Sequence, residues 1–384
     1  MNTLIEFSPT LLTNGWSASA NAAVDSDAHV RDHDADGSLA VETLTRARSL
    51  GLSTALVPRE FGGGGASHAE MGGVLREIAH TDAAAAVTLA MHSHLVAFHV
   101  WRQRHGQDAS PMFAKVTDGA WLVSTGAADW VSSSGTARKV DGGYRVSAAK
   151  APASGCELGD LLVTSIRWAE PGAAPQVLHC VVPFAAEGVR VERTWDTLGL
   201  RGTGSHTVVL DDVFVPEAAV SLIRPADVWH PVWNIVVGAA LPLIMAAYNG
   251  IADAAVDAAL AMVSARNDDS AQQTAGEMVT AHLMGSESVD AMFVASDNLN
   301  YENTDAHSAA VMARKRTATD AFVDTVRLAM ELVGGRSYFR GNPFEHMYRD
   351  MLGAQFHPLP RARQSRFTGR VALGLDPLGA VPPA

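Results

Sequence analysis

The hydrophobic period changes twice along this chain, and this change limits the possible folds more than any other feature. Apolar residues recur at helical spacing up to about residue 119, alternate with a period of two from about 121 to 216, and then return to helical spacing. Short strands without helices between them are typical of an antiparallel barrel or sandwich. We therefore predict a mainly α protein with a central β domain, divided into an N-terminal helical domain (1–119), a β domain (120–228) and a C-terminal helical bundle (229–384).

Composition restricts the class of protein further. Of the 384 residues 47% are hydrophobic and 18% charged, which is ordinary for a folded chain with a large core. A net charge of -12 without clusters of Lys and Arg argues against a nucleic-acid binder. Cys156 and Cys180 are the two cysteines, too few for a disulfide framework or a cysteine zinc site. The opening residues lack the pattern of a signal peptide, so we expect a cytoplasmic protein.

One segment has to be weighed as a membrane span. Residues 231–252 are 22 residues without a formal charge, which is long enough to cross a bilayer. Pro242, Asn234 and Asn249 interrupt this segment, and such residues are unfavourable in lipid. We predict a buried core helix here and no membrane span.

Two stretches carry a resemblance to a known family. The first is LGLRGTGSHTVVLDDVFVPE (198–217), a Gly-x-Arg-x-(Ser/Thr)-x-Ser pattern that leads into a strand ending in Val-Pro. The second is AMELVGGRSYFRGNPFEHMYRD (329–350), with a Gly-Gly turn, aromatic residues and a closing Arg-Asp pair. Together with LVPREFGGGG and the pair GGYRVSAAK and ASGCELGDLLVTS, they make nearly the whole chain resemble the acyl-CoA dehydrogenase family.

This resemblance implies an antiparallel β-barrel and a C-terminal four-helix bundle with FAD bound between them. It also implies a dimer or homotetramer, possibly a hetero-oligomer, in which a neighbouring subunit helps to bind the FAD. Ser124 and Thr125 match positions at the pyrimidine edge of the flavin, where hydroxyl groups suit its carbonyls. Ala153 and Ser154 match the position against the central ring, where a hydroxyl can hydrogen-bond to N5.

The resemblance assigns further residues to the dinucleotide. Gly334 and Gly335 lack a Cβ atom and so permit close approach of the backbone to a ligand. Arg266 matches a basic residue that faces the pyrophosphate. Glu331 stands where the family has a glutamine, and an acid beside a pyrophosphate is unfavourable unless it is screened.

The sequence departs from the family at its catalytic base. Dehydrogenation of an acyl thioester needs a base for the α-proton, and the family places a glutamate at one of two positions. These positions hold Pro358 and Ala240 here. His357, next to the vacated position, is the nearest replacement because an imidazole can act as a base.

Histidines on the segment MHSHLVAFH are the next candidates. His92 is a second candidate catalytic residue, since the comparable helix faces the substrate in flavin monooxygenases of this fold. His92 and His99 share a helix face, and His94 is expected to point away from it. We expect no metal site here, since no third ligand is spaced to join them.

Three functions remain open. The first is an FAD-dependent acyl-CoA dehydrogenase with a non-standard base and an acyl-CoA as its small-molecule substrate. The second is a flavin-dependent monooxygenase or oxidase of the same fold, similar to the dibenzothiophene and hydroxyphenylacetate monooxygenase groups, which need no glutamate. The third is a non-catalytic subunit of a heteromeric enzyme, which Glu331 would favour.

Overall fold

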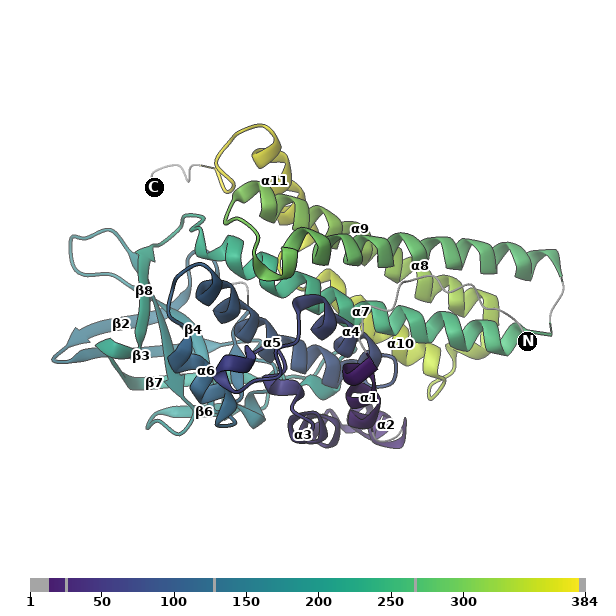
Figure 1. Cartoon of the computed structure of the whole chain (residues 1–384), viewed down its shortest axis with the longest axis horizontal. Coiled ribbons are helices and arrows are strands. Elements are labelled where there is room, and N and C mark those ends of the chain that lie inside the picture. The colour runs from purple at the N-terminus through teal and green to yellow at the C-terminus, as the bar shows by residue number, and fades with distance from the viewer. Residues whose placement is uncertain (1–13, 25–26, 127–128, 266–267, 380–384) are drawn as a thin grey trace.

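The computed structural model describes residues 14–24, 27–126, 129–265 and 268–379. Helices form its N-terminal part and pack around the apolar helix α5 (Figure 1). Ser67 begins α4 with a capping box, because its hydroxyl accepts from the Glu70 N–H while the Glu70 carboxylate accepts from the Ser67 N–H. The helices of this part are α1 (Asn14–Ala23), α2 (Asp27–Asp36), α3 (Val41–Ser49), α4 (His68–Ala79), α5 (Ala83–Arg104) and α6 (Ser110–Thr117).

An eight-stranded sheet follows, in the order β6-β7-β3-β2-β4-β5-β8 with β1 also beside β4. The fold class predicted from the sequence is confirmed, but the sheet is mixed where a purely antiparallel barrel was expected. Both β1 and β2 pair with β4 in parallel, and the other pairs are antiparallel. The strands are β1 (Leu122–Ser124), β2 (Ser134–Val140), β3 (Gly143–Lys150), β4 (Leu161–Trp168), β5 (Gln176–Pro183), β6 (Val189–Glu192), β7 (Thr207–Pro216) and β8 (Val220–Pro225).

The parallel pairs arise because β1 and β2 form one interrupted strand. Ser124 pairs with Val163 and Ser134 with Ile166, and the described residues between them, 125–126 and 129–133, belong to no strand. Lys150 holds this segment from β3 by donating to Asp129 at 2.8 Å and to the carbonyl of Ser165 at 2.5 Å. Lys150 is fully buried, and desolvation lowers its pKa. The interruption therefore places loop side chains between the sheet and α5.

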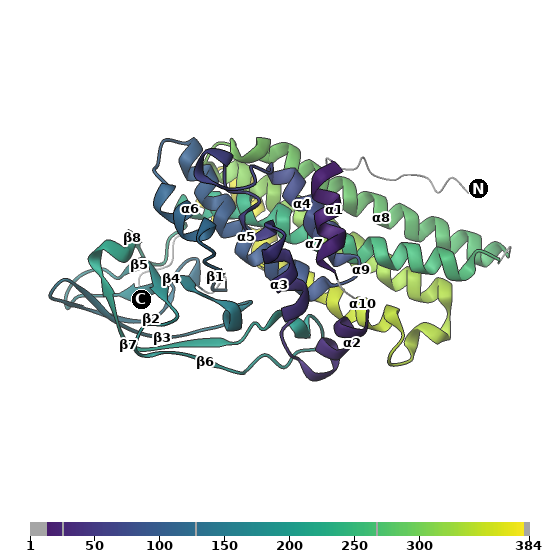
Figure 2. The same cartoon turned by 60° about the horizontal axis from the view of Figure 1, so that its bottom comes forward.

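Three long helices form most of the C-terminal part (Figures 1 and 2): α7 packs on α4 and α5, and α8 and α9 pack on α7 and on each other. Helix α7 runs through Pro242 and its central residues are almost all buried. Two helices, α5 and α7, are long and apolar enough to cross a membrane, but 78% and 94% of their most apolar windows are buried in the protein. The core helix predicted for 231–252 is confirmed. The helices are α7 (Val232–Val263), α8 (Asp269–Ser296), α9 (Asp305–Val333), α10 (Pro343–Met351) and α11 (Arg361–Ala372).

The two stretches that carry the family resemblance contact each other. The N–H of Leu200 donates to the Asp350 carboxylate at 2.5 Å, and Arg349 donates to the carbonyl of Leu198 at 2.9 Å. Gly199 is required between them, since a Cβ atom there would lie 2.3 Å from the Arg349 carbonyl oxygen. This contact fixes the end of α10, from which the chain runs directly to His357.

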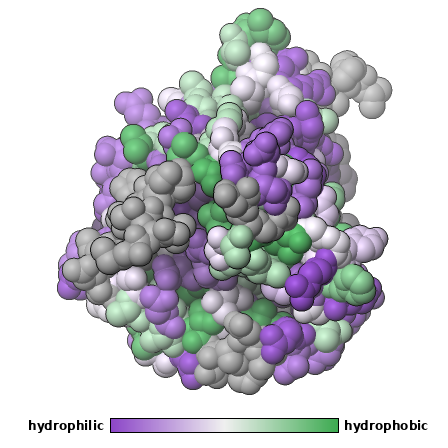
Figure 3. Space-filling model, turned by 90° about the vertical axis from the view of Figure 1, so that its right-hand side faces the viewer, coloured by the Kyte–Doolittle hydropathy of each residue, from purple (hydrophilic) through white to green (hydrophobic). Residues whose placement is uncertain are grey.

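The surface at the ends of the long helices is mixed. On the face that Figure 3 shows, hydrophobic residues form small patches among hydrophilic ones. Elsewhere on the chain Val294, Tyr338 and Phe356 are large apolar side chains with exposed fractions of 80%, 84% and 77%. Such exposure is compatible with subunit packing but does not give the number of subunits.

Candidate functional site

A cavity of about 990 Å³ lies between α5, the start of α6, the sheet and the start of α7. Its volume is at the upper end of the range for small-molecule and cofactor sites. One side of α5 lines it through His94, Leu95, Phe98, His99 and Arg102. These positions follow helical spacing, so a single helix face borders the cavity. Thr125, Asp129 and Trp130 from the strand interruption border its opposite side.

Four buried polar atoms in the cavity wall have no hydrogen-bond partner among the described residues. They are His99 Nδ1, Ser124 Oγ, Trp233 Nε1 and Asn303 Oδ1. His99, Ser124 and Trp233 are 8%, 7% and 7% exposed, and Asn303 is half-buried. An unsatisfied buried polar group costs about 1–3 kcal/mol, so such groups are rare without a reason. Their presence in one cavity indicates that a polar ligand completes it.

His94 lines this cavity and is close enough to His357, which is absent from the lining, to affect its pKa. The His94 ring lines the cavity and its Nδ1 lies 3.3 Å from the carbonyl oxygen of Ala90. Burial lowers the pKa of His94 to about 4, and desolvation, Lys315 and His94 together lower that of His357 to about 3. Both imidazoles are therefore neutral at physiological pH, and each can accept or donate one proton.

Buried side chains fix the loop that carries His357. Lys315 on α9 donates to the His357 carbonyl at 2.9 Å, and Gln364 on α11 donates to the Leu359 carbonyl. The Tyr248 ring on α7 lies edge-on to the His357 ring at 5.5 Å between centroids. Its hydroxyl is buried without a hydrogen-bond partner among the described residues. The loop that replaces the family's glutamate segment is thus held on both sides of Pro358, with polar groups around it.

The residues predicted for the flavin ring lie on the sheet side. The Ser154 hydroxyl lies 2.7 Å from that of Ser205, and both belong to a short chain of hydroxyls that ends at Thr203. Ala153 is fully buried, and its N–H donates to the His206 carbonyl. Because Thr203 donates to the Leu200 carbonyl, Ser205 donates to Thr203 and Ser154 to Ser205, so the Ser154 oxygen stays able to accept a hydrogen bond. Neither Ala153 nor Ser154 is among the residues that line the cavity.

The two residues at the predicted pyrimidine edge differ in their surroundings. Ser124 offers its hydroxyl to the cavity without a protein partner, which fits a ligand carbonyl. The Thr125 hydroxyl donates to the Asp129 carboxylate at 2.7 Å and thereby helps to hold the loop. The Ser124 hydroxyl is thus available to a ligand, whereas the Thr125 hydroxyl is used in a hydrogen bond within the protein.

His92 has a different position from the one expected. Its Nδ1 accepts from the N–H of Leu122 at 3.0 Å, its Nε2 donates to the carbonyl of Ser53 at 2.9 Å, and its ring stacks on Trp121. Both ring nitrogens are used and His92 is absent from the cavity lining that includes His94. These contacts join α5 to β1, so we propose a structural role for His92. His94 is the histidine of this pair that lines the cavity.

The residues predicted for the distal part of a dinucleotide lie apart from this cavity. Glu331 pairs with Arg327 at 3.0 Å, so a cation already screens its charge. Gly334 ends α9 at a φ of 84°, a conformation that favours glycine. Neither Gly334 nor Gly335 has an atom within 4 Å of the position of a Cβ, so backbone is accessible there. Arg266 lies outside the described residues.

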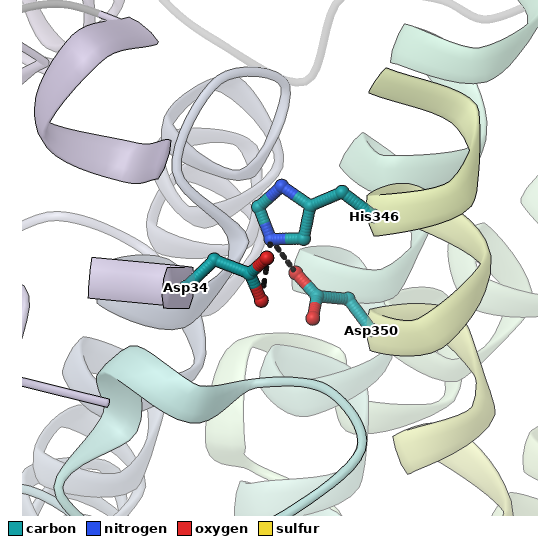
Figure 4. A group of neighbouring side chains, drawn as sticks. All are labelled: Asp34, His346 and Asp350. Carbon is teal, nitrogen blue, oxygen red and sulfur yellow. Dashed lines mark ion pairs between the residues drawn. The ribbon is translucent and has the colours of Figure 1, made fainter. Parts of the chain in front are cut away.

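A second cavity, of about 960 Å³, lies beside α2 and α10. Asp34, His346 and Asp350 point toward one another on its wall (Figure 4), and their ligand atoms lie within 4.8 Å of each other. Arg349 already binds Asp34 through two contacts of 2.7 Å. Desolvation lowers the pKa of His346, but the carboxylates of Asp350 and Asp34 raise it by more, to about 9. This imidazole is therefore positively charged at neutral pH. The group is therefore a cluster of ion pairs in which positive side chains occupy the place of a cation.

The fold and the cavity define the class of this protein. Residues 17–109 match the sequence profile of the acyl-CoA dehydrogenase N-terminal domain, and 241–357 that of the acyl-CoA dehydrogenase C-terminal domain. The chain has the architecture of the flavin-dependent oxidoreductases built on this fold. It belongs to the acyl-CoA dehydrogenase family, and it lacks the glutamate at both family positions.

Several relatives resemble it over nearly their full length. A pigment production hydroxylase of Rhodococcus sp. is 28% identical over 369 residues, which cover 88% of this chain and 91% of the relative. The amino sugar nitrososynthase DnmZ of Streptomyces peucetius is 26% identical over 374 residues, 91% and 90% of the two chains. The structure of KijD3 in complex with FMN and a dTDP-linked amino sugar has a TM-score of 0.83 at 23% identity and covers 98% of each chain.

Proposed function

We propose that this chain is a flavin-dependent monooxygenase and not an acyl-CoA dehydrogenase. The observation that carries this proposal is the replacement of the family's carboxylate base by Pro358, with the neutral imidazoles of His357 and His94 beside it. The carboxylates that line the described cavity are Asp129, which is paired with Lys150, and Asp108 at its exposed edge. Neither is placed to remove a proton from a buried substrate.

A bound reduced flavin would supply the electrons that activate oxygen. We propose FAD as this flavin, with the Ser124 hydroxyl toward a flavin carbonyl and the Ser154 hydroxyl toward the central ring. We propose that the neutral imidazoles of His357 and His94 would donate or accept a hydrogen bond on the side of α5, and that burial keeps bulk water away. The hydroxylase and nitrososynthase relatives, whose names indicate oxygen insertion, support this proposal. We further propose a cytoplasmic homo-oligomer and a small-molecule substrate.

Two measurements on the purified, flavin-loaded protein separate the proposed reactions. Octanoyl-CoA added without oxygen should leave the oxidised flavin spectrum unchanged, because no base is available for the α-proton. After chemical reduction, mixing with aerated buffer should reoxidise the flavin rapidly. Bleaching by octanoyl-CoA with slow reoxidation would show a dehydrogenase instead, and a protein that binds no flavin would be a non-catalytic subunit.

The variant His357→Ala tests the predicted role of the imidazole. Loss of the His357 imidazole should leave flavin binding intact. It should increase the hydrogen peroxide released during flavin reoxidation, since the hydrogen bond that this imidazole offers is then missing. His80→Ala serves as a matched control, because His80 is half-exposed and pairs with Asp257 outside this cavity. Equal peroxide yields in the two variants would remove His357 from the mechanism.

A further inference from the structure

The cavity beside α5 contains more unsatisfied groups than the proposed flavin uses. Ser124 is assigned to the flavin, which leaves His99 Nδ1, Trp233 Nε1 and Asn303 Oδ1 in the wall without a partner among the described residues. The indole N–H of Trp233 is a donor, so its partner must offer an acceptor. Burial lowers the pKa of His99 to about 3, so its neutral ring offers one donor and one acceptor nitrogen. A ligand here therefore carries at least one hydrogen-bonding group.

Aromatic side chains form much of the remaining wall. Phe98 from α5, Trp130 from the strand interruption and Trp233 from α7 all line it. Trp130 and Trp233 stack at 5.2 Å with an angle of 12° between their planes. The rigid pair presents ring edges and faces to whatever occupies the space, and these are favourable contacts for another aromatic ring.

The charged side chains around the cavity are paired, half-buried or exposed at its rim. Asp129 is bound by Lys150, and the half-buried Arg102 donates to the uncharged amide of Gln107 at 3.0 Å. Lys115 and Asp108 are exposed at the rim. Burial keeps the histidines of the wall neutral, as it lowers the pKa values of His94, His99 and His179 to about 4, 3 and 3. The described wall thus offers no buried cation to an anionic ligand, and burying an unpaired anion is costly.

Resting on the proposed function, we propose that this cavity binds an uncharged aromatic substrate with a hydroxyl or similar polar group, which His99 and Trp233 hold. Neither a nucleotide-linked sugar nor an acyl-CoA meets this description, because each carries phosphates that need a cation. His99 and Trp233 act on substrate position, whereas His94 and His357 lie at the end where the reaction occurs.

Three probes of one ring size test this inference by calorimetry on the flavin-loaded protein. At pH 7, 2-naphthol is uncharged and has a hydroxyl, naphthalene lacks the polar group, and 2-naphthoate carries a negative charge. We expect 2-naphthol to bind at least about tenfold more tightly than either of the others, since one satisfied buried hydrogen bond is of that order. Equal binding of 2-naphthoate, or tighter binding of dTDP, would overturn the inference.

Two variants identify the groups that bind the hydroxyl. His99→Leu and Trp233→Phe should each weaken 2-naphthol by about tenfold and leave naphthalene unchanged. His80→Ala should change the binding of neither 2-naphthol nor naphthalene. Circular dichroism checks that each variant is folded. If Trp233→Phe does not fold, His99→Leu decides alone, and unchanged 2-naphthol binding by that variant contradicts the inference.

The binding assay does not depend on oxygen chemistry. Selective binding of 2-naphthol by a protein whose reduced flavin reacts slowly with oxygen would support the inference and contradict the proposed function. Rapid reoxidation of the flavin without selective binding of 2-naphthol would support the proposed function and contradict the inference.

Discussion

Lys315 shows how one buried charge can serve a site that it does not enter. Its side chain is 1% exposed and donates to the carbonyl of His357, and Arg316 and Asp320 are the charged neighbours on its own helix. Desolvation lowers its pKa to about 8. Replacing Lys315 by an apolar residue of similar volume removes the desolvation cost of its charge, which offsets the loss of the hydrogen bond to the His357 carbonyl. The lysine is therefore explained better by the position of His357 than by the stability of α9.

Lys315→Met should fold with near-normal stability and lose the fixed position of the His357 loop. We expect the fraction of flavin oxidation that yields hydrogen peroxide to rise several-fold, because the imidazole no longer holds one place. A peroxide assay during turnover or reoxidation measures this fraction. Arg316→Met, at the next position of the same helix, should leave the fraction unchanged, and an equal rise in both variants would mean general loosening of α9.

At this scale the sequence predicted some residues of the site and missed others. Ser124 was predicted because its position matches one at the flavin's pyrimidine edge, and it lines the cavity. His357 was predicted because it stands next to the vacated glutamate position, and its role stays a prediction. His99 and Trp233 were not assigned to ligand binding. A histidine or tryptophan in an apolar helix is expected to be a core residue, and the sequence does not show which hydrogen-bond partners it has. Helical spacing grouped His92 with His99 and turned His94 away from them, whereas in the structure His94 and His99 both line the cavity and His92 does not.

At the level of elements, the interrupted strand is the feature that periodicity could not reveal. An alternating pattern shows that a segment is a strand but not the direction of its neighbour. Evenly spaced strands favoured antiparallel pairing, and this held for the pairs joined by turns, such as β2 with β3. The parallel pairing of β1 and β2 with β4 follows from the buried contact of Lys150 with Asp129, which are 21 residues apart.

The contact between 198–200 and α10 can be tested at Gly199. Gly199→Ala should lower the free energy of unfolding by about 1–3 kcal/mol, because the new methyl group collides with the Arg349 carbonyl. Gly276→Ala is the matched control: Gly276 lies within α8 with no atom within 4 Å of its Cβ position, and alanine there should stabilise the helix by up to about 1 kcal/mol. Urea unfolding monitored by circular dichroism gives both values. A Gly199→Ala variant as stable as the parent would show that the contact can relax.

For the whole molecule, buried neutral histidines predict loss of stability in acid. In the folded chain the pKa values of His68, His92, His94 and His307 are lowered to about 4, and those of His99, His179 and His357 to about 3, mainly by desolvation. Between these values and the unfolded value of about 6.5, the unfolded chain binds more protons than the folded one. The free energy of unfolding should therefore fall as pH falls from about 6.5 to 4, by at most about 1.4 kcal/mol per pH unit for each histidine.

Urea unfolding at pH 7, 6 and 5 measures this slope. His68→Gln should make the slope shallower, because glutamine can replace the contacts of His68 with Ala239 and Ser296 without binding a proton. An identical slope in this variant would exclude His68 as a contributor. His346 acts in the opposite sense: its pKa is raised to about 9, so its contribution is present below about pH 6.5 and is lost as pH rises toward 9.

The interrupted strand also has a consequence for engineering. Since β1 and β2 are each anchored to β4, residues between them can be lengthened or exchanged without shifting the register on either side. Asp129 and Lys150 should be kept unchanged in libraries of such variants, because their contact holds these residues on the sheet. Directed evolution of substrate range would then concentrate on Thr125 and Trp130, which line the cavity without belonging to a strand.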